Sequence, residues 1–186
     1  EDEIDAVHVD EETQEESKAT FPDAETYENK LKSALKYLKD HSADILHKDH
    51  LQQYSHKLLK LLENITTPDH AGLHLVYSQF RTIEGIGIIK LILEANGFAE
   101  FKLVKNAGSW DIKETEGDEG LPRFVLYTGT ESKEEKEIVR NIYNSNWSSV
   151  PETVKEKLNA IAGNNYMGEI IKIGLKVCLP VRNHCD

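Results

Sequence analysis

Two groups of polar side chains accompany apolar segments that are typical of buried strands. The first group follows residues 73–77, and the second lies at the end of residues 123–128. In an open α/β sheet, ligands bind at the carboxyl ends of the strands, so polar residues there form either a ligand site or a helix cap. The residues of the two groups are Ser78, Gln79, Arg81, Thr128, Gly129 and Thr130.

Each group also has a purely local explanation. Ser78 or Thr82 can cap the helix that follows, Gln79 can satisfy a neighbouring backbone group, and residues 128–130 can form a tight turn. Caps and ligand contacts do not exclude each other, so both interpretations stand at this point.

Histidines and cysteines supply the other candidates for chemistry. Histidines are dense between residues 41 and 56, and His47 and His50 can share a helical face, but no firm third ligand lies nearby. Cys178 and Cys185 lack the spacing of a zinc site. We therefore expect no metal site, and the sequence has no G-x-S-x-G nucleophile elbow.

The charge of the chain is concentrated at one end. The 186 residues carry a formal net charge of −11, which by itself argues against nucleic-acid binding, because phosphate binding needs a positive surface. Residues 1–16 hold nine acidic residues and no Lys or Arg, so the remainder carries −2, the difference between −11 and −9. The sequence predicts a disordered acidic tail over residues 1–20 and leaves nucleic-acid binding open for the rest.

Hydrophobic periodicity predicts helices around the two polar groups. Helical spacing covers residues 24–65, with a break near 41–50. Ser132 and Glu135 form a capping box that starts a helix directly after the second polar group. A further helix is expected to begin near Pro151.

The helix after the first polar group is the most apolar in the chain. Its pattern begins at Thr82 and ends at Asn96-Gly97, and its isoleucines cover more than one face, which predicts burial. Gly85 and Gly87 lie inside this pattern, where each costs about 0.5–1 kcal/mol relative to alanine. We therefore expect another group to pack closely against the first turns.

Four apolar segments predict strands, at residues 73–77, 98–104, 123–128 and 170–177. The polar stretch between the second and third segments indicates a surface excursion. The order of strands and helices is typical of an α/β layer fold with mostly parallel strands. In a parallel sheet both strand-to-helix junctions lie at the same edge, so the two polar groups should be neighbours.

Three segments resemble the second RecA-like domain of superfamily 2 helicases and translocases, especially the branch found in nucleocytoplasmic large DNA viruses. They are LVYSQFRTIEGIGIIKLILEANGF, RFVLYTGTESKEEKEIVRNIYNSNW and GEIIKI, and the similarity covers roughly residues 54–173. In this resemblance, residues 76–80 correspond to motif IV and residues 127–130 to the next motif that contacts nucleic acid. Residues 168–173 correspond to the strand that leads into motif V.

The resemblance implies a partial RecA-like three-layer fold with a mostly parallel sheet, preceded by a helical segment. Together with the charge and periodicity, it divides the chain into an acidic tail (1–20), a helical lead-in segment (21–68), a truncated RecA-like domain (69–178) and an irregular tail (179–186). It also gives all six polar residues a role in nucleic-acid binding. Hydroxyl and amide groups contact phosphates, Gly129 lets backbone N–H groups approach them, and Arg81 neutralises one. Such contacts follow the backbone of DNA or RNA without reading bases.

The chain also departs from the family. It has no G-x-x-x-x-G-K-[ST] phosphate loop, and KVCLPVRNHCD stands where the family continues into motifs V and VI. We therefore expect a fragment that is not catalytic alone. The resemblance implies ATP and Mg²⁺ only for the complete parent protein, an ATP-dependent hydrolase, and a first RecA-like domain as the partner.

A second hypothesis is a non-enzymatic α/β module, derived from such a domain, that contacts protein partners. For either function we expect a soluble protein inside the cell, in the cytoplasm or, for a viral protein, in the virion or viral factory. No apolar run reaches membrane-spanning length, and two cysteines form no disulfide framework.

Overall fold

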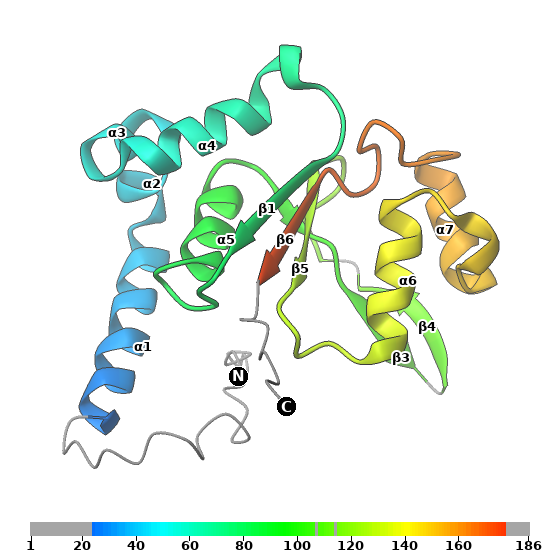
Figure 1. Cartoon of the computed structure of the whole chain (residues 1–186), viewed down its shortest axis with the longest axis horizontal. Helices are drawn as coiled ribbons and strands as arrows, with labels where there is room; N and C mark the ends of the chain where they lie inside the picture. The colour runs from blue at the N-terminus through cyan, green and yellow to red at the C-terminus, as the bar shows by residue number, and fades with distance from the viewer. Residues whose placement is uncertain (1–23, 107, 114, 178–186) are drawn as a thin grey trace, which may run out of the picture.

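The fold is described by a computed structural model that covers residues 24–106, 108–113 and 115–177 (Figure 1). The tails predicted for residues 1–20 and 179–186, and the two cysteines, lie outside these ranges. Within the ranges, no helix is both long enough and apolar enough to cross a bilayer.

A four-stranded parallel sheet forms the centre of the fold. Its strand order is β1 (His74–Ser78), β6 (Ile173–Val177), β5 (Arg123–Tyr127) and β2 (Ala99–Glu100). Short apolar runs form these strands, as is usual in parallel sheets that helices cover. The prediction of an α/β fold with a parallel sheet is confirmed, although the last strand begins at Ile173 rather than at residue 170.

Helices cover both faces of the sheet (Figure 1). They are α5 (Ile86–Ala95), α6 (Lys133–Tyr143), the short 3-10 helix η3 (Trp147–Ser149) and α7 (Glu152–Ile161). Phe124, Ile173 and Leu175 are buried in one cluster with α5. Val125 and Ile171 are buried in a second cluster with α6 and α7, on the opposite face. The result is a three-layer arrangement, consistent with part of a RecA-like fold.

The polar stretch before β5 contains a hairpin that the periodicity did not predict. β3 (Leu103–Asn106) and β4 (Ser109–Ile112) pair antiparallel, and Gly108 in the turn has a φ of 88°. Trp110 and Ile112 are buried in the cluster of α6 and α7. The prediction of a surface excursion is therefore wrong for β4, where two apolar side chains alternate with polar ones. The strand expected at 98–104 is split between the sheet and this hairpin.

The lead-in segment is built from four helices and a 3-10 turn. They are α1 (Ala24–Asp40), α2 (Ser42–Ile45), α3 (Lys48–Tyr54), α4 (His56–Thr66) and η2 (Pro68–His70). The predicted break near 41–50 is confirmed, with α2 inside it. A second break occurs at Ser55, because its side chain caps α4 by accepting a hydrogen bond from the amide of Leu58 at 3.3 Å.

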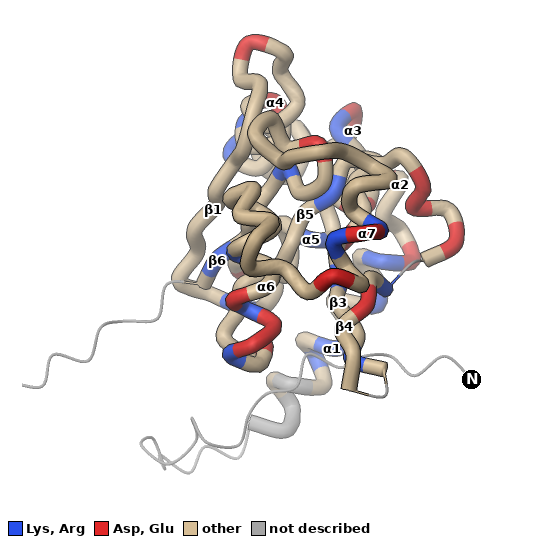
Figure 2. Tube along the Cα trace, turned by 90° about the vertical axis from the view of Figure 1, so that its right-hand side faces the viewer, with Lys and Arg blue, Asp and Glu red and all other residues tan. Residues whose placement is uncertain are grey.

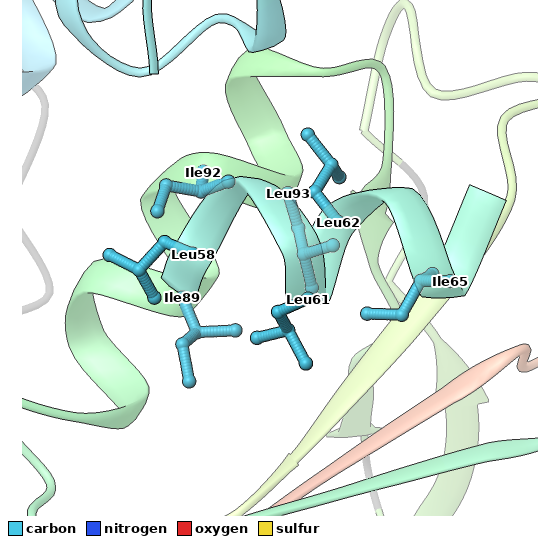
Figure 3. A pocket seen from close by; sticks show the side chains of 7 residues that line it. All are labelled: Leu58, Leu61, Leu62, Ile65, Ile89, Ile92 and Leu93. Carbon is cyan, nitrogen blue, oxygen red and sulfur yellow. The ribbon is translucent and has the colours of Figure 1, made fainter. Parts of the chain in front are cut away.

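α4 packs the lead-in segment onto α5. Apolar side chains of the two helices surround a crevice of only about 10 Å³ (Figure 3): Leu58, Leu61, Leu62, Ile65, Ile89, Ile92 and Leu93. The Asn96 side chain donates to the carbonyl of Leu46 and accepts from the amide of Lys48, both at 2.9 Å. α5 thus has the sheet on one side and α4 on another, which confirms its predicted burial and explains its apolar pattern.

A buried amide holds the loop that leads into β6. Asn165 has no exposed surface, and its Oδ1 accepts from the amides of Ile170 and Ile171 at 2.8 and 2.9 Å. Its Nδ2 donates to the carbonyls of Tyr143 and Ile171 at 3.1 and 3.0 Å. Both halves of this amide are satisfied, so the loop after α7 is held against the end of α6.

Candidate functional site

The two polar loops leave the sheet at the same edge. β6 pairs in parallel with β1 on one side and with β5 on the other, so Ser78 and Tyr127 both end their strands at the carboxyl edge. A Cβ atom built on Gly129 would lie 2.8 Å from Nη2 of Arg81. The guanidinium of the first loop therefore reaches the second loop, as the parallel topology predicts.

A hollow of about 490 Å³ opens where the loops meet. α5, β2, β5 and α6 contribute to its walls, and Arg81, Thr128 and Thr130 line it. Ser78 and Gln79 lie at the end of β1, with β6 between them and β5. Ser78 is half-buried and Gln79 is exposed. The structure thus brings Arg81 together with residues 128–130 and leaves the other two predicted residues apart.

In the loop after β1, backbone carbonyls close the loop by binding the amides at the start of α5. The carbonyl oxygens of residues 80–82 accept hydrogen bonds from the amides of residues 85–87 at 3.0 Å. Such amides lack partners at an ordinary helix start, so α5 does not present them to an anion. A Cβ atom on Gly85 would overlap the Phe80 carbonyl oxygen and the Ser78 hydroxyl. The close packing expected against the glycines is thus confirmed.

Side chains of this loop do not cap α5. The helix begins at Ile86 and has no side-chain hydrogen bond at its start. The Ser78 hydroxyl accepts a hydrogen bond from the amide of Phe80 at 3.1 Å, and the Thr82 hydroxyl donates to Glu84. The helix start expected at Thr82 is therefore wrong, and neither Ser78 nor Thr82 caps α5, because backbone carbonyls bind the amides instead.

The loop after β5 is closed by a carboxylate. Glu131 accepts hydrogen bonds from the amides of Thr128 and Gly129, both at 3.0 Å, and from the Thr128 hydroxyl at 2.8 Å. Its side chain is only 16 % exposed. These donors are the groups expected to bind a phosphate, and in this structure they bind an anion that belongs to the chain.

Glu131 is charged at neutral pH. Burial by itself would raise its pKa, but the hydrogen bonds from Thr128 and Gly129 outweigh burial, so the pKa lies below its usual value. Lys136 supports the loop from the other side, because its Nζ lies 3.9 Å from Glu131 and donates to the Gly129 carbonyl at 3.0 Å. Sequence reasoning missed Glu131, although a carboxylate two residues after a glycine turn was a usable signal.

Four cationic side chains line the hollow, and three of them lie beside carboxylates. Lys90 and Lys102 pair with Glu100 at 2.6 and 3.3 Å, and Lys136 lies beside the carboxylate of its loop. Burial would lower the pKa of Lys90, but Glu100 outweighs it and the pKa is raised. Arg81 differs: within the ranges that the structure describes, no carboxylate or other acceptor pairs with its guanidinium. Arg81 is thus the cation of this hollow that no described carboxylate neutralises.

The start of α6 borders the hollow. As predicted, the Ser132 hydroxyl caps this helix and accepts a hydrogen bond from the amide of Glu135 at 3.1 Å. Acidic and basic residues are mixed over residues 133–137, where α6 begins (Figure 2). Most of this run is exposed, whereas Glu135 and Lys136 are half-buried and line the hollow.

The histidines of the lead-in segment have local contacts. His47 precedes α3, and its Nδ1 accepts a hydrogen bond from the amide of Asp49 at 3.5 Å. The ring of His41 stacks on Tyr37 with centroids 4.2 Å apart. Among the residues with described positions, no three His, Cys, Asp or Glu side chains are grouped to hold a metal ion.

Comparisons of this chain with protein-family models, with curated proteins and with solved structures found no match. The function is therefore inferred from the sequence motifs and from the geometry at the sheet edge.

Proposed function

We propose that this chain is part of the second RecA-like domain of a superfamily 2 helicase or translocase, and that it contacts the sugar-phosphate backbone of a nucleic acid. The observation that carries the proposal is the meeting of Arg81 and Gly129 at the carboxyl edge of a parallel sheet. The two loops that meet there are the segments with the helicase-like motifs. In the complete protein this chain supplies one side of the interdomain ATP cleft, and it is not catalytic alone.

Arg81 supplies the charge for this contact. Its guanidinium is unpaired among the described residues, and a guanidinium can donate two parallel hydrogen bonds to phosphate oxygens. Gln79 is exposed and adds a neutral donor, whereas the Thr130 hydroxyl lies 3.0 Å from the Thr128 hydroxyl and is hydrogen-bonded to it. The Thr128 hydroxyl already donates to Glu131 and is less available. None of these contacts depends on a base, so the binding is independent of sequence and serves DNA or RNA.

ATP and Mg²⁺ enter this proposal through a partner. The chain has no G-x-x-x-x-G-K-[ST] loop, whose backbone and lysine hold the phosphates and whose hydroxyl binds Mg²⁺. A first RecA-like domain, in cis or in trans, would supply that loop inside the cell. This chain alone is therefore not expected to hydrolyse ATP.

Replacement of Arg81 by alanine tests the proposal. Titration of fluorescein-labelled single-stranded DNA at several salt concentrations, followed by fluorescence anisotropy, measures both affinity and salt dependence. Arg81→Ala should weaken binding to all sequences alike. It should also flatten the slope of log K against log salt by about 0.7, the share of one phosphate contact.

Arg123→Ala is the matched control. Arg123 starts β5 at the opposite edge of the same sheet, so its removal takes away the same charge far from the loops. The melting temperature of Arg81→Ala should stay near that of the wild type, because Arg81 has no ion pair to lose within the described residues. Equal losses of affinity in both variants would contradict the proposal, since net charge alone would then explain binding.

One observation favours the second candidate function, a protein-interaction module. β1 is an edge strand of the sheet, and Leu73 and Leu75 are 37 % and 51 % exposed. An apolar edge strand is a surface to which a strand of another protein can add. Absence of single-strand binding by the wild-type chain at low salt would favour this function over the first.

A further inference from the structure

A row of three side chains crosses the sheet beside the loop of Arg81. Tyr77, Lys176 and Tyr127 stand opposite one another on β1, β6 and β5. Nζ of Lys176 lies 5.9 Å from the ring centroids of both tyrosines. Because paired residues of parallel strands face the same side, the row lies on the face of the sheet that α6 covers in part.

α6 leaves one end of this row open. Tyr127 is half-buried, and its hydroxyl donates to the carbonyl of Lys136 at 3.2 Å. Tyr77 is 53 % exposed, and Phe80, in the loop that follows, is 56 % exposed. Lys176 is exposed as well, and no carboxylate among the described residues pairs with it. The edge therefore presents two exposed aromatic rings, those of Tyr77 and Phe80, and two cations, Lys176 and Arg81.

We propose that Tyr77 is a stacking platform for a base of a single-stranded nucleic acid whose phosphates lie along Lys176 and Arg81. The inference rests on the proposed function and adds to it a contact with the bases. Every base has an aromatic face, so stacking on a tyrosine tolerates any sequence. Phe80, in the same loop as Arg81, offers a second exposed ring.

Charge decides between a nucleic acid and a protein as the occupant of this surface. The two cations beside the rings lack carboxylate partners within the described ranges, which favours a polyanion over an apolar protein helix. The bases of a duplex already stack on their neighbours, whereas those of a single strand can be splayed onto a ring. A single strand is therefore the ligand.

The test compares two labelled strands of equal length, about 15 nucleotides. One is single-stranded DNA of mixed sequence, and the other has the same backbone with abasic sites throughout. Tyr77→Leu removes the ring and keeps an apolar side chain, Tyr77→Phe keeps the ring, and Tyr166→Leu is the control, since Tyr166 is 69 % exposed in the loop before β6. Fluorescence anisotropy gives the affinity of each variant for each strand.

Tyr77→Leu should weaken binding of the base-containing strand about fivefold or more and leave binding of the abasic strand unchanged. Tyr77→Phe and Tyr166→Leu should bind both strands as the wild type does. The salt dependence of Tyr77→Leu should equal that of the wild type, since no phosphate contact is lost. If Tyr77→Leu binds both strands like the wild type, or loses both equally, the stacking proposal is wrong.

The result separates this inference from the proposed function. If Arg81→Ala weakens binding and Tyr77→Leu does not, only the stacking contact fails, and the aromatic surface belongs to protein contacts. If the wild-type chain binds neither strand, the proposed function and the stacking contact are both wrong. Photocrosslinking of the wild-type chain to DNA that contains 5-iodouracil needs no variant: crosslinks at Tyr77 or Phe80 support the platform, and crosslinks confined to other segments overturn it.

Discussion

In the two loops at the sheet edge, the backbone amides near the start of the following helix are bound by different groups. Each loop follows a parallel strand and leads into a helix whose first amides lack partners within the helix. After β1, carbonyl oxygens of residues 80–82 bind those amides. After β5, Ser132 caps α6, and Glu131 binds the amides of Thr128 and Gly129. Backbone carbonyls thus bind the amides of the first loop, and a carboxylate binds those of the second.

This difference decides what each loop offers to a ligand. Carbonyl oxygens carry no net charge, and Arg81 has no carboxylate partner among the described residues. Closure by Glu131 occupies the amide donors and places a negative charge where a phosphate would lie. A nucleic-acid backbone would therefore be attracted at Arg81 and would compete with Glu131 at Gly129. Polar residues of similar type can thus present opposite charges to the same ligand.

The largest expected effect comes from Gly85→Ala, which breaks the closure of the first loop. A Cβ atom at this position would overlap the Phe80 carbonyl oxygen and the Ser78 hydroxyl, and it would lie 2.8 Å from the Phe80 carbonyl carbon. The backbone must move, and we expect a loss of about 3 kcal/mol in the free energy of unfolding. Urea denaturation measures it.

Gly163→Ala provides the control for this change. Nothing lies within 4 Å of a Cβ atom built on Gly163, so the same substitution there should leave the free energy of unfolding within about 0.5 kcal/mol of the wild type. If Gly85→Ala is equally harmless, the close approach of the loop backbone to α5 does not exist in solution.

A smaller effect is expected from Glu131→Gln, which weakens the closure of the second loop. At neutral pH the loss of a charged acceptor should cost about 1 kcal/mol in the free energy of unfolding. The pKa of Glu131 is lowered in the folded protein, so its contribution is present above the unfolded pKa of about 4.5 and is lost as pH falls through the folded pKa. The difference between wild type and variant should therefore shrink below pH 4.5.

Glu137→Gln, on the helix α6 that follows the Glu131 loop, is the matched control. Its side chain is 67 % exposed and lies 3.7 Å from Arg140, so its neutralisation removes the same charge with little effect on stability. A pH-independent difference between wild type and Glu131→Gln would show that shape rather than charge closes the loop.

The smallest expected effect concerns binding by Glu131→Gln. Removal of the internal anion should strengthen binding of single-stranded DNA about threefold at low salt, because a phosphate no longer meets a like charge at Gly129. Anisotropy titration measures the change, with Glu137→Gln again as the control. Weaker binding by Glu131→Gln alone would mean that the closed loop is the form that binds, and the contrast between the two loops would disappear.

Local patterns predicted the parts of this site that depend on neighbouring residues. The capping box at Ser132 and Glu135 is confirmed, because both partners lie within one helical turn. The burial of α5 is confirmed, because its apolar residues cover more than one face. Its start was misplaced to Thr82, since no periodicity shows that carbonyls of the preceding loop will bind the first amides. β4 was missed because only two of its side chains are apolar and buried.

The sequence by itself determined the α/β class, the two strand-to-helix junctions and their polar residues, because periods, caps and turn residues act over a few neighbours. It also implied that the two junctions lie at one edge of the sheet, since the carboxyl ends of parallel strands meet at the same edge. Only the tertiary structure decided that β6 lies between β1 and β5, that Arg81 reaches Gly129, and that Lys176 stands between two tyrosines. Those contacts join segments far apart in the chain, and their geometry depends on strand order and register, which local patterns do not encode.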